Sequence, residues 1–212
     1  MDIKASLGGK AVLVAVSKTK PVEDILALYA EGQRDFGENY VQELVDKQLR
    51  VPSDIRWHFI GHLQSNKVRY IIGFIHLIHG VDSLSLLKEI NKQAVKAGRV
   101  VDVLLQVYIA REETKFGLDP AELSDLVQTV QAAPEEWTNV RLRGLMGMAS
   151  FSNNPDSIRS EFRTLKGLFD KYFAVSEPRP ILSMGMSGDY QLAEAEGSTM
   201  VRIGSLLFGK RG

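Results

Sequence analysis

The sequence predicts an α/β protein with a single domain, a (β/α)8 TIM barrel that occupies residues 1–212. Short apolar runs alternate with segments of helical periodicity about eight times, which is the pattern of parallel strands joined by helices. No linker or low-complexity tract interrupts this alternation, and 212 residues are enough for one large core. A doubly wound open sheet is the alternative, but it would seldom need so many parallel strands, and no GxGxxG motif follows the first strand.

The first half of the chain supplies four of the expected strand–helix units. An apolar strand at 11–17 comes first. The helix after it begins at Pro21, which suits the first helical turn, and ends at Gly32. The further strands are expected at 35–39, 56–61 and 76–82, and the further helices at 40–49, 65–72 and 84–97.

The second half continues the same alternation. Strands are expected at 100–109, 140–150, 181–187 and 200–209, and helices at 119–132, 156–173 and 189–196. Asp119 and Pro120 suit the N-cap and the first position of their helix. The helix at 156–173 has the most regular apolar side.

The composition excludes several classes of function. Lysine plus arginine equals aspartate plus glutamate, 26 against 26, so net charge gives no indication of nucleic-acid or anionic-membrane binding. The absence of cysteine excludes a disulfide framework, a thiolate zinc site and a cysteine nucleophile. The N-terminal residues do not form a signal peptide, and the first apolar run is too short to span a bilayer. We therefore expect a cytoplasmic protein.

The first strand ends on an amine. Lys18 shares its parity with Val12, Val14 and Val16, so it enters the mouth of the barrel if the even-numbered face points inward. Burial there would lower its pKa and favour the neutral amine that Schiff-base chemistry requires. The alternative is a lysine that reaches the surface at a strand end.

Arg202 interrupts the apolar last strand, between Val201 and Ile203. A cation inside a closed barrel needs an anion or an acceptor. One candidate partner is a carboxylate such as Glu38, in a structural ion pair. The other is an acceptor on a bound ligand.

Small residues with hydroxyls follow the last two strands, where TIM barrels often bind phosphate. These residues are Ser183, Ser187, Gly204 and Ser205. The alternative is that they form short turns that simply need small residues. An amine, a phosphate site and an inward cation together suggest pyridoxal 5′-phosphate (PLP), with its aldehyde on Lys18 and Arg202 facing the pyridine nitrogen. An arginine donor would leave that nitrogen unprotonated and make the ring a poorer electron sink.

The histidines give weaker signals. His58 and His62 are four residues apart but do not share a helical face, and His76 and His79 have opposite parity on one strand. We therefore predict core or rim positions for His58 and His62, and we do not expect His76 and His79 to bind a metal together.

Several motifs together resemble the pyridoxal phosphate homeostasis protein family, whose members are similar to the N-terminal barrel of alanine racemase. The motifs are AVSKTKP, FGENYVQE, WHFIGHLQSNK, GLMGMA and LSMGMSGDYQLAEAEGSTMVRIGSLLFG. The resemblance implies that Lys18 is the Schiff-base residue, that Asn39 lines the ring, and that Arg202 lies at the pyridine nitrogen. It also implies that Ser183, Ser187, Gly204 and Ser205 surround the phosphate. Lys20, Lys67 and Lys115 fall in matching motifs as secondary amines, and Lys20 is the rival for the Schiff base.

The resemblance implies a protein that takes part in intracellular PLP homeostasis, by buffering the cofactor or delivering it to apo-enzymes, without established catalytic turnover. A low-activity PLP-dependent amino-acid racemase or lyase is the alternative, and a module that binds a protein partner is a third hypothesis. Because the chain ends at Gly212, directly after the last expected strand, we expect no second domain and no second acid/base. We also expect a monomer that binds neither nucleic acid nor membrane.

Overall fold

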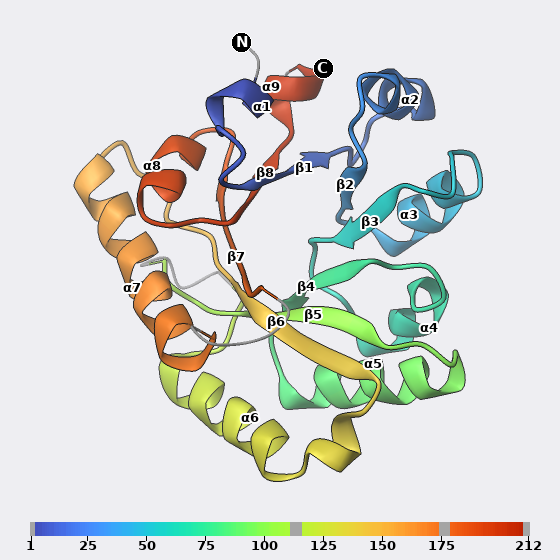
Figure 1. The fold of residues 1–212 in the computed structure, drawn as a ribbon, viewed down its shortest axis with the longest axis vertical. Helices are drawn as coiled ribbons and strands as arrows, with labels where there is room; N and C mark the ends of the chain where they lie inside the picture. Colours follow the sequence, from blue (N-terminus) through green and yellow to red (C-terminus); the bar gives the residue numbers. More distant parts are fainter. Residues whose placement is uncertain (1–2, 111–115, 174–178, 210–212) are drawn as a thin grey trace.

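The computed structural model describes residues 3–110, 116–173 and 179–209. Eight parallel strands close into a barrel in which each strand pairs with the next along the chain and β8 pairs with β1 (Figure 1). The strands are β1 (Val12–Val16), β2 (Asp35–Glu38), β3 (Arg56–Phe59), β4 (Leu77–Val81), β5 (Val101–Gln106), β6 (Val140–Met146), β7 (Ile181–Met186) and β8 (Met200–Ile203). The predicted fold class is confirmed.

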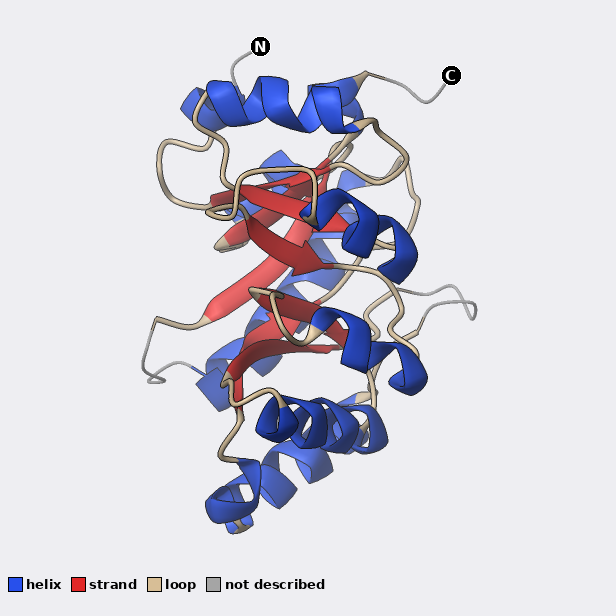
Figure 2. Cartoon of the chain, turned by 90° about the vertical axis from the view of Figure 1, so that its right-hand side faces the viewer, coloured by secondary structure: helices blue, strands red, loops and turns tan. Residues whose placement is uncertain are grey.

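Helices surround the ring of strands, as the side view shows (Figure 2). They are α1 (Ile3–Ser6), α2 (Val22–Ala30), α3 (Val41–Gln48), α4 (Val68–Ile71), α5 (Leu84–Lys96), α6 (Pro120–Ala132), α7 (Pro155–Phe173), α8 (Tyr190–Ala195) and α9 (Ser205–Phe208). Two 3₁₀ turns, η1 (Ser65–Lys67) and η2 (Pro134–Trp137), precede α4 and β6. No helix within the described ranges is both long and apolar enough to cross a bilayer.

The expected elements are found with shorter strands. The start of α6 agrees with its prediction, because Asp119 accepts hydrogen bonds from Ala121 and Glu122 and forms a capping box. The last strand was predicted too long: it ends at Ile203, and the apolar residues after Gly204 form α9 instead. A short apolar run fits a strand or a helix equally well, so its sequence could not distinguish the two.

Alternate residues along each strand face two different cores. The residues inside the barrel include Val14, Leu77, Leu104, Met146 and Met200, which form a small apolar cluster. The intervening residues, such as Ala15, Phe36 and Ile78, face outward and pack with the helices in the main core. On β1 the even-numbered residues therefore point inward, as the parity argument for Lys18 requires.

Candidate functional site

A cavity of about 490 Å³ opens at the carboxyl ends of the strands. Its walls come from the ends of β1, β7 and β8, from the segments that follow β1, β2, β3, β6, β7 and β8, and from α7. Active and binding sites of TIM barrels lie at this end of the strands. The candidate residues that line it are Lys18, Asn39, Ser187, Arg202, Gly204 and Ser205.

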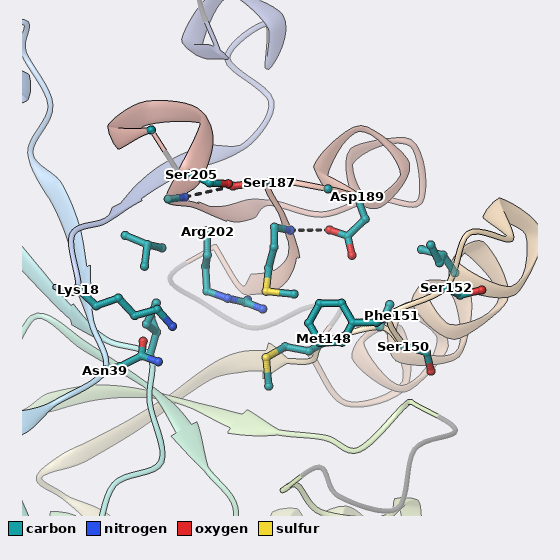
Figure 3. Close-up of a pocket in the computed structure, with 18 of the residues that line it drawn as sticks. Lys18, Asn39, Met148, Ser150, Phe151, Ser152, Ser187, Asp189, Arg202 and Ser205 are labelled. Atoms are coloured by element: carbon teal, nitrogen blue, oxygen red, sulfur yellow. Dashed lines mark hydrogen bonds between the residues drawn. The ribbon is translucent and has the colours of Figure 1, made fainter. Parts of the chain in front are cut away.

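Lys18 lies on the wall of this cavity, half-buried, and its side chain extends alongside Asn39 (Figure 3). The turn that carries it is tight. The Lys20 amide donates to the Ser17 carbonyl at 3.0 Å, and Thr19 has a left-handed φ of 63°. Of the two sequence alternatives, the structure supports the one in which the lysine enters the cavity.

A buried ion pair fixes this turn from outside the barrel. The Lys47 amine donates to the Ser17 carbonyl at 2.7 Å, to Glu38 Oε1 at 2.8 Å and to Glu43 Oε1 at 2.6 Å. Ser17 Oγ donates to the same Glu38 oxygen at 2.6 Å. Burial raises the pKa of Glu38, although the hydrogen bonds from Lys47 and Ser17 oppose it. Sequence reasoning missed Lys47, because helix α3 brings it to Ser17 across 30 residues.

Asn39 presents an unsatisfied polar atom at the cavity. Its Oδ1 is buried and has no hydrogen-bond partner among the described residues. Gly61 lies against its backbone, where a Cβ would come within 2.3 Å of the Asn39 carbonyl oxygen. A buried amide oxygen without a donor is costly to a folded protein, and a bound ligand is one way to satisfy it.

Arg202 is 4% exposed and lies at the base of the cavity. Its Nη1 donates to the Ser183 carbonyl at 2.9 Å and to Ser183 Oγ at 2.6 Å, and its Nη2 donates to the Gly147 carbonyl at 3.0 Å. Burial lowers its pKa to about 10, with Asp189 opposing, so the group stays cationic at neutral pH. The alternative ion pair with Glu38 is wrong, because Glu38 bonds Ser17 and Lys47 outside the barrel.

The loops after β7 and β8 meet at the opposite wall of the cavity (Figure 3). The Gly204 amide donates to Ser187 Oγ at 3.3 Å, which ties the two loops together. The Met186 amide donates to Asp189 Oδ1 at 2.6 Å and closes the turn after β7. Gly185 has a φ of 95°, and a Cβ there would come within 2.6 Å of Ala193, so the turn requires glycine. Small residues therefore leave this wall open to an anionic group.

The structure also describes Ser183 and two of the three further lysines, Lys20 and Lys67. Ser183 does not line the cavity: it is fully buried inside the barrel, where its Oγ bonds Arg202 and His79, so we assign it to the support of Arg202. Lys20 lines the cavity, but its amine donates to the Phe208 carbonyl at 3.0 Å. Lys67 lies 5.7 Å from the Tyr70 ring centroid and does not line the cavity. Lys115 lies outside the described residues.

The opposite end of the barrel brings Asp35, His58 and His76 together, with ligand-type atoms within 4.8 Å of one another. Sequence reasoning did not find this group, because it comes from three different strands or strand ends. Arg56 already donates to both Asp35 carboxylate oxygens, and Arg143 and Arg179 line the same depression. This concentration of cations opposes a metal ion, so we assign the group no metal.

Residues 2–212 match the family model described as the N-terminal domain of alanine racemase. The chain belongs to this family. A protein of Aquifex aeolicus (strain VF5) named pyridoxal phosphate homeostasis protein is 43% identical over 205 residues, which cover 95% of this chain and 87% of that protein. The resemblance drawn from the motifs is confirmed.

Solved structures of PipY from Synechococcus elongatus PCC7942 share this barrel. The structure without PLP is 36% identical, with a TM-score of 0.90, and the match covers 98% of this chain and 96% of that one. The structure with PLP bound is also 36% identical, with a TM-score of 0.84, and the match covers 97% and 98% of the two chains. Members of the family with this fold therefore include one that has been solved with PLP.

Proposed function

We propose that this chain binds pyridoxal 5′-phosphate in the cavity, holds it as a Schiff base on Lys18, and takes part in PLP homeostasis by buffering or delivering the cofactor. The observation that carries the proposal is the PLP-bound structure of PipY, which matches nearly the whole chain at 36% identity. The name of the Aquifex aeolicus relative supports the same function.

The residues present fit this cofactor. When bound, PLP supplies an electrophilic aldehyde. The Lys18 nitrogen would attack its carbonyl carbon, and the carbonyl oxygen would leave as water. Asn39, which lines the cavity beside Lys18, would line the ring. Ser187, Gly204 and Ser205 would surround the phosphate on the open wall.

Arg202 would face the pyridine nitrogen. Three of its N–H groups already have protein acceptors, which fix the plane of the guanidinium at the cavity base. An arginine donates hydrogen bonds and is not a proton source at neutral pH, so the pyridine nitrogen would stay unprotonated. This arrangement favours holding the cofactor over stabilising a carbanion.

A low-activity amino-acid racemase or lyase is the second candidate, because the matching family model carries the name of alanine racemase. A two-base racemisation needs a second acid/base on the other face of the substrate. Within the described residues, the cavity wall carries no tyrosine or histidine that could serve. We therefore propose a protein without catalytic turnover.

The experiment is reduction of the PLP-treated protein with borohydride, followed by mass spectrometry of the modified peptide. We expect a reduced adduct on Lys18, together with a visible absorption band that Lys18→Ala abolishes. Lys20→Ala is the matched control, since Lys20 lines the same cavity but bonds the Phe208 carbonyl. An adduct on Lys20 alone, or a spectrum unchanged in Lys18→Ala, would contradict the assignment.

Two further measurements separate the alternatives. Turnover of amino acids that is lost in Lys18→Ala would favour the enzyme. Transfer of PLP to an apo-enzyme faster than free release would support delivery. We propose that the recipients are apo PLP-dependent enzymes, and that the chain acts as a cytoplasmic monomer without a nucleic-acid or membrane partner.

A further inference from the structure

Five buried polar residues cross the interior of the barrel in an unbroken hydrogen-bonded series, which we call the polar column: Arg202, Ser183, His79, His58 and Asp35. Ser183 Oγ lies 2.6 Å from Arg202 Nη1 and 3.1 Å from His79 Nδ1. His79 Nε2 lies 2.9 Å from His58 Nδ1, and His58 Nε2 lies 3.1 Å from Asp35 Oδ1. The column therefore joins the base of the cofactor cavity to the opposite end of the barrel.

The column is buried along its length and reaches the surface depression at the opposite end of the barrel only at Asp35. Ser183, His58 and His79 are 0% exposed, Arg202 is 4% exposed and Asp35 is 8% exposed. Their positions follow from strand parity, since each of the five lies on the inner face of its strand, where the side chain points into the barrel. Buried polar groups without partners are expensive, so all donors and acceptors in such a series should be matched.

When every donor in the polar column is paired with an acceptor, the hydrogen bonds have one consistent direction. Arg202 can only donate, so Ser183 Oγ accepts from it, and the serine hydroxyl must then find an acceptor. The only other partner recorded for Ser183 Oγ within the described residues is His79 Nδ1. His79 Nδ1 is therefore the acceptor and carries no hydrogen.

The same pairing of donors with acceptors determines the direction of the other two hydrogen bonds, from His79 to His58 and from His58 to Asp35. A neutral His79 carries its hydrogen on Nε2 and donates to His58 Nδ1. His58 then carries its hydrogen on Nε2 and donates to Asp35 Oδ1. Both histidines are neutral in this arrangement. Desolvation, with the charge of Arg202 adding to it, holds the pKa of His79 well below its ordinary value, which agrees with a neutral ring.

The column ends on a carboxylate that is held ionised. Burial alone would raise the pKa of Asp35, but the hydrogen bonds from His58 and Arg56 outweigh it and hold the pKa below its usual range. No carboxylate is recorded in a hydrogen bond or ion pair with Arg202 among the described residues. The oriented dipoles of Ser183 and the two histidines thus lie between a buried cation and a distant anion.

We propose that His79 and His58 are positioning residues for the cofactor site: as neutral Nε2–H tautomers they orient Ser183 as an acceptor for Arg202 and link that guanidinium to Asp35. This inference rests on the proposed function, because the group that Arg202 would meet is the pyridine nitrogen. Ser183 holds Arg202 from below through two acceptor atoms, so its orientation determines where the guanidinium points. Nothing in this arrangement moves a proton.

The first test reads the tautomers in the cofactor-free protein by long-range ¹H–¹⁵N correlation of the imidazole rings. The chain has only 4 histidines, so His79→Gln and His58→Gln assign their own signals by loss. At neutral pH we expect both rings to be neutral with the hydrogen on Nε2. A hydrogen on Nδ1 of His79, or a positively charged His58, would overturn the proposed direction.

The second test measures the dissociation constant for PLP. We expect His79→Phe to weaken binding about tenfold, because Ser183 loses the acceptor that orients its hydroxyl, an effect of about the size of one net hydrogen bond. His79→Gln should restore most of the affinity, since its amide offers both an acceptor and a donor. His76→Phe is the matched control. Its ring contacts His58 at a centroid distance of 5.4 Å but no hydrogen bond to it is recorded, so its affinity should equal that of the wild type.

The outcomes distinguish this inference from the proposed function. If the wild type fails to bind PLP, the proposed function fails, while the tautomer signals still decide the direction of the column. If His79→Phe folds and binds PLP as tightly as the wild type, the positioning role is overturned. If His79→Phe does not fold, Ser183→Ala tests the same link, because it removes Oγ but keeps the backbone acceptor of Arg202.

Discussion

Lys47→Met should destabilise the protein through Glu38, and the size of the effect can be worked out from the structure. Glu38 is 0% exposed and shares one carboxylate oxygen between Lys47 and Ser17, while its other oxygen has no partner among the described residues. Without the ammonium the buried carboxyl would be held neutral. Keeping a group of ordinary pKa 4.5 protonated at pH 7 costs about 3 kcal/mol, at 1.36 kcal/mol per pH unit.

The sign of the pH dependence follows from the raised pKa of Glu38 in the variant. A carboxyl whose folded pKa exceeds its unfolded value contributes no penalty below the unfolded pKa, and the penalty grows as pH rises. The destabilisation by Lys47→Met should therefore fall from about 3 kcal/mol at pH 7 to about 1 kcal/mol at pH 5.

The assay is urea unfolding at the two pH values, followed by far-UV circular dichroism. In Glu38→Gln/Lys47→Met the carboxyl is absent, so the pH-dependent part of the loss should disappear. Lys166→Met is the matched control: Lys166 pairs with Asp170 on the surface of α7, and exposed pairs contribute less than about 1 kcal/mol. Equal destabilisation by Lys47→Met at pH 5 and pH 7 would refute the reasoning.

Two other predictions concern the cavity and the barrel interior. Gly61→Ala should displace Asn39, because the new Cβ would lie 2.3 Å from the Asn39 carbonyl oxygen, and the affinity for PLP should fall at least about tenfold. In the same titration, the control Gly73→Ala should leave the affinity for PLP unchanged, because its new Cβ meets no atom within 4 Å. His79→Gln should flatten the loss of stability on acidification. A histidine that ionises near pH 6.5 in the unfolded state but stays neutral in the folded state lowers the free energy of unfolding by about 2 kcal/mol between pH 7 and pH 5. If the free energies of unfolding of the wild type and the variant fall in parallel across this range, the buried neutral ring is contradicted.

The fold could be predicted because the alternation of strands and helices determines most of it. The parity rule also predicted correctly that Lys18 shares a face with Val14 and Val16. Val14 lies in the apolar cluster inside the barrel, and Val16 and Lys18 both line the cavity. Boundaries were less accurate where the signal is weak. Residues 206–208 are apolar in a row, which suits a strand as well as the helix α9 that they form.

Most of the candidate site was also predictable, since it lies at strand ends in any TIM barrel. The partners of its residues were not. The alternation of side chains along β3 indicates that His58 points inward. Its hydrogen bonds to Asp35 on one side and His79 on the other depend on the stagger between neighbouring strands, which the sequence does not show. Glu38 illustrates the same limit: it is one residue out of phase with the inner face of β2, and so it meets Lys47 rather than Arg202.

The two polar groups that would act on the cofactor are thus supported from opposite sides of one sheet. The turn of Lys18 is fixed by Lys47 and Glu38, which lie between the strands and helix α3. Arg202 is fixed by Ser183 and the histidines behind it, inside the barrel. The strand wall separates the two supports, and no hydrogen bond between them is recorded in the described part of the chain. Because unconnected sites contribute additively to stability and binding, a change in one support should leave the other intact, and the amine and the guanidinium can be examined independently.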